Sequence, residues 1–439
     1  MAQELSPAQR TLTVGVLGAG TVGSQVIRLL TEQADDFAAR SGARLEVTGV
    51  AVRDVSAPRD TAVRRDLLTD DVTAVATGND LVIELIGGIE PARTLILAAL
   101  KSGASVITGN TALIAAHGPE LYDAAAAAGT DFYYEAAVAG AIPVVYALRE
   151  SMAGDRVTSV LGIVNGTTNY ILDEMSTKGL SFEEALATAQ ALGYAEADPT
   201  ADVDGLDAAA KAAILASLSF HTRVGLSDVQ VEGIRSVTAD DIREAHASGC
   251  ELKLLAIAQL REDEHARGVS VRVHPALVPA DHPLASVHGA YNAVLVEAES
   301  AGRLMFYGQG AGGAPTASAV LSDVVAAAAH RVYGGRAPRE SSYARLSVLG
   351  PEEAVTRYQI QLRVEDAAGS LAAMAGVFAD NEVSINSVRQ SAYVTRDGAA
   401  VVTFVTHPAP VFHLDAAVEG LRHSERVLEV VSVWRVEGQ

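Results

Sequence analysis

The chain has 439 residues, of which 49% are apolar and 20% charged, so it is too long for one hydrophobic core and about two or three domains are expected. Its 33 basic and 54 acidic residues give a formal net charge of −21 at pH 7. This balance argues against nucleic acid or an anionic membrane as a partner and favours a soluble enzyme that holds its substrate with local groups.

The N-terminus, MAQELSPAQR, lacks the apolar segment of a signal peptide. The longest uncharged run, 304–322, is rich in Gly, Gln, Ser, Thr and Pro and would not span a bilayer. The single cysteine, Cys250, cannot form an internal disulfide, which fits a reducing compartment. We therefore expect a cytoplasmic protein with no membrane partner.

Residues 11–30, TLTVGVLGAGTVGSQVIRLL, predict a buried strand, a tight turn and a helix. They contain a G-x-G-x-x-G pattern, whose glycines permit the turn, let a pyrophosphate approach the backbone, and let helix and strand pack closely. The phosphates would then lie at the helix N-terminus. A glycine-rich turn without a ligand is the alternative. The residues expected at the nucleotide are Gly18, Ala19, Gly20, Thr21, Val22 and Gly23.

Further strands are predicted at 45–52, 81–87 and 104–109, with a helix over 90–103. Strands that alternate with helices indicate an α/β fold with a doubly wound, parallel sheet of the Rossmann type. We assign residues 1–134 to this nucleotide-binding domain. A glycine-rich loop and helix at 308–335 are expected to return to it.

From residue 135 the pattern changes. Helices are predicted over 181–193, 207–221 and 240–260, and strands over 269–278 and 290–300. We therefore expect an α+β substrate-binding and dimerisation domain at 135–307.

The turn-rich stretch 336–355 is a predicted linker. After it we expect strands at 356–364, 383–393, 399–406 and 427–436, with helices at 370–380 and 414–422. This βαββαβ order predicts a small ferredoxin-like unit at 356–439.

The stretch GYAEADPTADVDGLDAAAK, residues 193–211, is unusually rich in acidic residues. Asp207 and Lys211 are four positions apart, so they share one face of a helix that begins near Leu206. That helix is otherwise apolar, and a partly desolvated lysine suits proton transfer. The alternative is an exposed helix ion pair beside a solvated loop, worth only about 0.3–0.5 kcal/mol.

Four long motifs carry a resemblance to a known family: EAAVAGAIPVVYALRESMAGD, GIVNGTTNYIL, GYAEADPTADVDGLDAAAK and GQGAGGAPTASAVLSD. In order and separation they resemble homoserine dehydrogenase, over essentially the whole chain. The C-terminal segment VEDAAGSLAAMAGVFADNEVSINSVRQ resembles the regulatory ACT domain that many of these enzymes carry.

The resemblance implies NAD(P)H-dependent, reversible reduction of L-aspartate 4-semialdehyde to L-homoserine, in the biosynthesis of threonine, methionine and isoleucine. Lys211 matches the proton-transferring lysine of the family and Asp207 the carboxylate beside it. Glu196 matches the residue that holds the substrate ammonium, and Asp202 another substrate contact. Tyr194, Gly166 and Thr167 match the pocket lining, whereas Asp198 and Asp204 are expected to be structural or solvated.

The family also holds a monovalent cation, usually sodium, with one side chain and several backbone carbonyls. The matching positions are Glu135, Val138, Gly140 and Ile142. The cofactor positions implied beyond the glycine turn are Gly87, Thr111 and Gly312, the last beside the nicotinamide half.

Two departures from the family pattern concern the cofactor. The family usually has a lysine after the Asn of its T-x-N-K motif, where this chain has Thr111. After the second strand, Arg53 lies at the position where the 2′-phosphate of NADP would bind. An acidic residue at this position would have favoured NAD. However, some members have a lysine shortly after this position, where this chain has Ala57. The 2′-phosphate would then be bound by Arg53, assisted by Arg59. The sequence thus predicts NADP or NAD, with a modest preference for NADP.

Two other interpretations stay open. The first is another Rossmann enzyme with an ACT tail, such as a phosphoglycerate or prephenate dehydrogenase, but it leaves NGTTNYIL and AEADPTADVDG unexplained. The second is a sensor of the same fold that is catalytically impaired because Thr111 replaces the lysine. The resemblance also implies a homodimer or homotetramer and feedback inhibition by L-threonine at the ACT domain.

Overall fold

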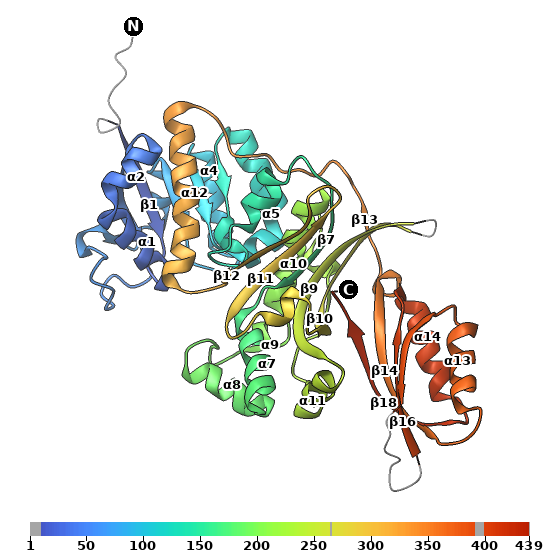
Figure 1. The fold of residues 1–439 in the computed structure, drawn as a ribbon. Coiled ribbons are helices and arrows are strands. Elements are labelled where there is room, and N and C mark those ends of the chain that lie inside the picture. Colours follow the sequence, from blue (N-terminus) through green and yellow to red (C-terminus); the bar gives the residue numbers. More distant parts are fainter. Residues whose placement is uncertain (1–9, 264–265, 391–398, 439) are drawn as a thin grey trace.

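The computed structural model describes residues 10–263, 266–390 and 399–438. Figure 1 shows an N-terminal α/β unit, a central mixed sheet with helices on one face, and a smaller C-terminal unit beyond it. Within the described ranges, no helix is long and apolar enough to cross a membrane.

The N-terminal unit is built on a parallel six-stranded sheet with the order β3-β2-β1-β4-β5-β6. This is the strand order of dinucleotide-binding folds, whose ligands bind at the carboxyl ends of the strands. Its strands are β1 (Thr11–Leu17), β2 (Arg44–Ala51), β3 (Leu68–Thr69), β4 (Leu81–Glu84), β5 (Ser105–Thr108) and β6 (Phe132–Tyr133). The helices between them are α1 (Thr21–Glu32), α2 (Ala34–Ser41), α3 (Val72–Thr77), α4 (Ala92–Lys101) and α5 (Thr111–Ala128).

The helix α12 (Gly313–Tyr333) returns the chain to this sheet, as Figure 1 shows. Its buried Ala317, Val320 and Val324 share a core with Val14 of β1 and Ile27 of α1. The loop before α12 is therefore held close to the glycine turn before α1.

The central sheet continues into the C-terminal unit, in the order β12-β11-β7-β9-β10-β18-β14-β16-β15. Its central strands are β7 (Val157–Ile163), β8 (Gln230–Val231), β9 (Cys250–Glu262), β10 (Arg267–Pro279), β11 (Tyr291–Ala298) and β12 (Gly302–Gln309). The helices of this part are α6 (Val144–Tyr146), α7 (Gly166–Lys178), α8 (Phe182–Ala191), α9 (Thr200–Val203), α10 (Leu206–Phe220) and α11 (Ala239–Ala247).

The helix predicted over 240–260 is wrong in its second half. The chain leaves α11 at Gly249, whose φ of +73° is a left-handed conformation that suits glycine, and then forms β9. Residues 252–258 of β9 are all buried. A strand buried on both faces shows no polar alternation, so its apolar run could not be told from a helix by periodicity.

The C-terminal unit has the predicted βαββαβ order, with one further two-residue strand, β17, before the second helix. Its elements are β14 (Val355–Glu365), α13 (Ser370–Asp380), β15 (Ile385–Gln390), β16 (Ala399–Thr406), β17 (Ala409–Pro410), α14 (Val411–Arg422) and β18 (Val427–Val436). The second helix begins three residues earlier than expected, and the predicted end of the second strand, 391–393, lies outside the described residues. Within 336–355, the expected linker, β13 (Ser347–Val348) pairs with β10.

Candidate active site

The glycine turn between β1 and α1 has the geometry that a dinucleotide requires. Gly18 has a φ of +100°, and a Cβ there would lie 2.7 Å from the Leu85 carbonyl oxygen. A Cβ on Gly23 would lie 2.1 Å from the Gly18 oxygen, so this glycine lets helix and strand pack closely. A Cβ on Gly20 would meet nothing within 4 Å. The open side of the turn is thus at Gly20, at the N-terminus of α1, where an anion is favoured.

Arg53 and Arg59 follow β2 near this turn. Arg53 is exposed, whereas Arg59 is half-buried and donates to the Ala19 oxygen at 3.4 Å and to the Asp54 oxygen at 2.9 Å. Arg59 therefore stabilises the loop beside the turn, and Arg53 is the more accessible cation.

A hydrogen-bonded cluster orders the ends of β4 and β5. The buried Glu84 accepts from the backbone N–H of Ile86 at 2.7 Å and of Gly87 at 3.2 Å, and from the Thr108 hydroxyl at 2.5 Å. Asn110 caps α5 and donates to the Gly88 oxygen at 2.6 Å. These bonds fix the two loops that would face the cofactor.

Thr111 begins α5 and is not free. Its hydroxyl donates to the Ala137 carbonyl oxygen at 2.7 Å. This bond connects α5 to the segment that follows β6.

The segment 135–142 passes beside the loop before α12. A Cβ on Gly140 would lie 2.4 Å from the Gly310 oxygen, and its φ is +56°. Gly312, with a φ of +119°, precedes α12, and a Cβ on the next residue, Gly313, would lie 3.1 Å from the Thr21 oxygen. The structure thus brings Gly312 and the predicted cation segment to the same side as the glycine turn.

The predicted cation positions are buried. The Glu135 carboxylate accepts from the backbone N–H of Val145 at 2.9 Å and of Tyr146 at 2.8 Å, and burial raises its pKa to about 7. The carbonyl oxygens of Val138 and Gly140 accept no hydrogen bond from any described residue, whereas that of Ile142 accepts from Val144. The described ranges contain no cluster of His, Cys, Asp and Glu that could hold a metal ion.

The predicted catalytic pair is formed at the start of α10. Lys211 Nζ donates to Asp207 Oδ2 at 2.7 Å and to the Val164 carbonyl oxygen at 2.9 Å. Its side chain is only 12% exposed, against 26% for Asp207. The pair is therefore an oriented, partly desolvated amine rather than the solvated surface pair of the alternative interpretation.

Asn165, at the N-cap of α7, joins this pair to Asp202 of α9. Its Nδ2 lies 2.8 Å from Asp207 Oδ2 and 2.7 Å from Asp202 Oδ1. Burial raises the pKa of Asp202, and the neighbouring Asp207 charge adds to this effect, while the Asn165 bond opposes it. Asn165 was not among the residues predicted for this site, although N-G-T-T at 165–168 is typical of a helix N-cap.

Gly166 and Thr167 follow at the start of α7. A Cβ on Gly166 would lie 2.6 Å from the Ala290 carbonyl oxygen, so only glycine fits there. The Thr167 hydroxyl donates to the Tyr194 carbonyl oxygen at 2.6 Å, which fixes the loop that carries Glu196.

The acidic stretch divides into two kinds of residue. Asp198 accepts from Thr200, and Asp204 forms an ion pair with Arg235, so both are structural. Glu196 is exposed, and its carboxylate accepts no hydrogen bond from the described part of the chain. Glu196 is therefore available to a cationic group of a ligand.

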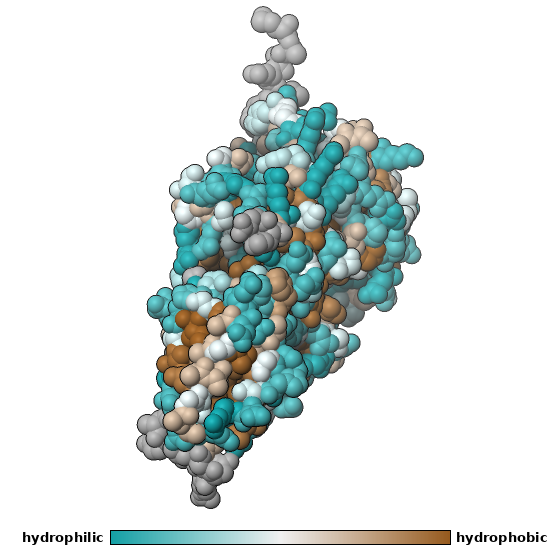
Figure 2. Space-filling model, turned by 90° about the vertical axis from the view of Figure 1, so that its right-hand side faces the viewer, coloured by the Kyte–Doolittle hydropathy of each residue, from teal (hydrophilic) through white to brown (hydrophobic). Residues whose placement is uncertain are grey.

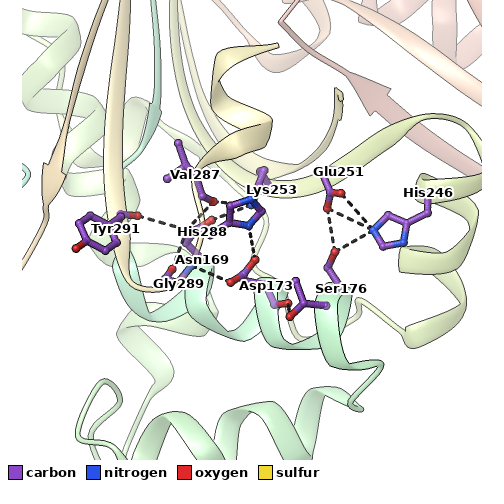
Figure 3. Close-up of polar contacts among 11 residues, drawn as sticks. Asn169, Asp173, Ser176, His246, Glu251, Lys253, Val287, His288, Gly289 and Tyr291 are labelled. Carbon is purple, nitrogen blue, oxygen red and sulfur yellow. Dashed lines mark hydrogen bonds and ion pairs between the residues drawn. The ribbon is translucent and has the colours of Figure 1, made fainter. Parts of the chain in front are cut away.

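A buried lysine of the central sheet supports α7. Figure 3 shows Lys253 of β9 pointing toward Asn169 of α7 and the Val287 carbonyl. Its Nζ donates to that oxygen at 2.8 Å, and Asn169 Nδ2 lies within 3.3 Å of the carbonyl oxygens of Val287, Gly289 and Tyr291. Burial lowers the pKa of Lys253. This cluster holds the loop 287–291 against the helix that begins at Gly166.

The comparisons with known proteins agree with this architecture. Residues 18–135 match the family model "Homoserine dehydrogenase, NAD binding domain", and residues 143–325 match "Homoserine dehydrogenase". A homoserine dehydrogenase of Corynebacterium glutamicum is 54% identical over 97% of this chain and 95% of its own length.

Two solved structures are also similar. A homoserine dehydrogenase from Thiobacillus denitrificans has a TM-score of 0.88 and 37% identity, covering 98% of both chains. A hyperthermophilic archaeal homoserine dehydrogenase mutant in complex with NADPH has a TM-score of 0.61 and 26% identity, covering 72% of this chain and 97% of its own.

Proposed function

Because the chain belongs to the homoserine dehydrogenase family of NAD(P)-dependent oxidoreductases, we propose that Lys211 is the group that transfers the proton in this reaction. The proposal is supported by the hydrogen bonds of its amine, to Asp207 at 2.7 Å and to the Val164 carbonyl at 2.9 Å, in a site that is largely removed from water. Both partners are acceptors, so they orient the N–H groups and leave a third for the substrate oxygen.

The nicotinamide cofactor supplies the hydride when bound. Lys211 then donates a proton to the nascent alkoxide during reduction, and its neutral amine accepts the hydroxyl proton during oxidation. Asp207 balances the charge of the ammonium and holds its position, and Asn165 holds Asp207.

For the substrate, we propose that Glu196 binds the α-ammonium group of L-homoserine or L-aspartate 4-semialdehyde. Its exposed carboxylate, which accepts no hydrogen bond from the residues that the structure describes, supports this role. Asp202 is a further substrate contact, and Tyr194, Gly166 and Thr167 line the pocket. The bond from Thr167 to the Tyr194 carbonyl makes this lining one connected unit.

For the cofactor, we propose that the turn 18–23 holds the pyrophosphate and that Arg53 meets the 2′-phosphate of NADP. The exposure of Arg53, together with the two backbone bonds that already engage Arg59, supports Arg53 as the phosphate ligand. Gly87, Thr111 and Gly312 would face the remainder of the dinucleotide.

We further propose a sodium ion beside Glu135, held by the carbonyls of Val138, Gly140 and Ile142. Two buried carbonyls without a hydrogen bond from the described residues, in the same segment as a buried carboxylate, are oxygen donors of the kind that a hard cation requires. The same segment contacts the loop before α12, so the ion would support the domain junction.

We propose that residues 1–134 with 308–335, residues 135–307 and residues 356–439 act as three domains, and that the last, an ACT domain, binds L-threonine as an inhibitor. We also propose a homodimer or homotetramer. Figure 2 faces the helix layer of the C-terminal unit, where apolar side chains gather. Leu371 of α13 and Phe412 of α14 are 50% and 47% exposed, and such exposed apolar groups suit an interface.

Threonine inhibition must be tested on the full chain. Glu437, near the C-terminus, pairs with the buried Arg272 at 2.9 Å and accepts from Thr356 at 2.8 Å. Removing the C-terminal unit would leave a buried arginine unpaired and confuse loss of inhibition with loss of stability. Inhibition at millimolar L-threonine is expected, and its absence would show that the unit has another ligand or only an assembly role.

The second candidate function is an impaired sensor of the same fold, favoured by one observation: the Thr111 hydroxyl is engaged by Ala137 and brings no positive charge. Turnover of homoserine, followed by the absorbance of NADH or NADPH, separates the two. Turnover at a rate typical of enzymes, roughly 1–1,000 per second, supports the dehydrogenase. No turnover with either cofactor would support the sensor.

A further inference from the structure

Asn165 lies where the proposed substrate contact meets the proton-transferring pair. It follows β7 by two residues, is the N-cap of α7, and is buried. The residue before it, Val164, accepts a hydrogen bond from Lys211 through its carbonyl oxygen. The chain that enters α7 therefore contacts both members of the pair, the lysine through a backbone oxygen and Asp207 through the Asn165 side chain.

The hydrogen bonds of Asn165 fix the direction in which its amide points. Oδ1 accepts from the backbone N–H of Thr168 at 2.9 Å and from its hydroxyl at 3.0 Å. Nδ2 donates to Asp202 Oδ1 at 2.7 Å and to Asp207 Oδ2 at 2.8 Å. A flipped amide would place its oxygen against two carboxylates and its nitrogen against an N–H group. The two N–H groups of one amide are thus shared between two acids.

These two acids carry like charges in a partly buried site. Burial raises the pKa of Asp202, and the charge of Asp207 raises it further, whereas the bond from Asn165, the charge of Lys211 and the Thr167 hydroxyl lower it. Where two carboxylates share a site with no donor between them, one of them retains a proton. The Asn165 amide occupies the position of such a proton, so both acids are ionised beside the lysine.

We propose that Asn165 is a positioning residue whose amide bridges Asp202 and Asp207, keeping the first charged for the substrate and the second turned toward Lys211. This inference rests on the proposed roles of those three residues. Aspartate would cap α7 as well as asparagine does, but it would add a third carboxylate. Serine would also cap the helix, but its hydroxyl has one hydrogen and cannot donate to both acids. Asparagine is therefore the cap that also serves the reaction.

Two variants separate the bridge from the cap. Asn165→Ser keeps an oxygen for the Thr168 N–H group and adds no charge, and Asn165→Asp keeps the cap but replaces the donor with a carboxylate. Ser181→Ala is the matched control, because it removes the N-cap of α8. Each full-length chain is tested for aspartate 4-semialdehyde reduction, homoserine oxidation and thermal unfolding.

We expect kcat/KM to fall by about tenfold or more in Asn165→Ser, since hydrogen bonds to charged groups are lost. The fall should be larger in Asn165→Asp, where three like charges meet. Ser181→Ala should unfold at a lower temperature and keep the wild-type kcat/KM.

The pH profile of reduction separates this role from a merely structural one. In that direction Lys211 acts in its protonated form, so the acid limb of kcat/KM reports the carboxylates. Asp204, the next acid along the chain, is paired with Arg235, so its charge is balanced locally. Because the Asn165 bond lowers the pKa of Asp202, its loss raises that pKa, and the acid limb of Asn165→Ser should move to higher pH.

Folded Asn165→Ser and Asn165→Asp chains that keep kcat/KM within about twofold of wild type would overturn the proposal. A loss of activity with an unmoved acid limb would also overturn it, since a structural defect lowers activity alike at every pH. If neither variant folds, Asp202→Asn decides, and an acid limb that persists unchanged there refutes the bridge. An inactive wild-type chain would refute the proposed function, whereas an active one with unaffected Asn165 variants refutes the bridge alone.

Discussion

Replacing Lys211 with Met is the most direct test of the active site. The substitution keeps most of the side-chain length and removes the amine that contacts Asp207 and the Val164 carbonyl. Because a positioned acid or base contributes about 10²–10⁴-fold, kcat should fall by that factor, while cofactor binding at the distant glycine turn should persist.

The structure also predicts a modest effect of this variant on stability. Asp207 and the Val164 carbonyl each lose a partner in a site where the lysine is 12% exposed. An unsatisfied buried group costs about 1–3 kcal/mol, so thermal unfolding must be measured beside the kinetics. Lys178→Met is the matched control, because Lys178 forms the same i,i+4 pair with Glu174 but is 60% exposed.

The assay is homoserine oxidation followed by NAD(P)H absorbance, with cofactor affinity measured separately. Asp207→Asn should also lower kcat, and the double variant should be hardly slower than Lys211→Met, because residues that act as one unit are non-additive. A folded Lys211→Met enzyme that retains about half of the wild-type kcat would refute the assignment.

The remaining predictions concern the ligands and position 111. Glu196→Gln should raise KM for homoserine by a larger factor than it lowers kcat. If kcat falls by the same factor as KM rises, or by more, Glu196 does not act mainly in binding the substrate ground state. Arg53→Ala should raise KM for NADPH and leave KM for NADH nearly unchanged; equal losses with both cofactors would show that Arg53 does not contact the phosphate. Thr111→Lys should raise kcat/KM for homoserine if a missing ammonium limits the reaction, and a decrease would mean that the site depends on the hydroxyl.

The Rossmann-type sheet and the helix with Asp207 and Lys211 could be predicted because they depend on local signals. One signal is a glycine turn after a buried strand, and the other is two charges four positions apart on an apolar helix. Each indicates the same local structure whatever the segment packs against. The strand β9 could not be predicted in this way, since burial on both faces removed the alternation that identifies strands.

Contacts between distant segments were the other part that the sequence could not provide. Asn165 appears in the sequence as a helix N-cap, but only the fold brings it within 2.8 Å of both Asp202 and Asp207. Lys253 is similar: nothing in its apolar stretch indicates that its amine binds the Val287 carbonyl, 34 residues away. The role of Asn165 depends on how α7 lies beside α9 and α10, and that of Lys253 on how β9 packs against α7. Spacing along the chain does not encode either arrangement.

Thr111 shows why the substitution to lysine is informative in either direction. If threonine at this position only removed the positive charge of a lysine, its hydroxyl would be left in solvent. Here the Thr111 hydroxyl donates a hydrogen bond to the Ala137 carbonyl oxygen at 2.7 Å. That carbonyl precedes Val138, the first backbone position of the proposed sodium site, so the hydroxyl ties α5 to the cation segment. Thr111→Lys therefore adds an ammonium but breaks this bond, at a cost of about 0.5–1.5 kcal/mol. If kcat/KM for homoserine rises despite that cost, the missing charge at position 111 limits the reaction. If kcat/KM falls and the activity depends more steeply on sodium concentration, Lys211 is the only ammonium group that the reaction needs, and Thr111 maintains the geometry of the domain junction.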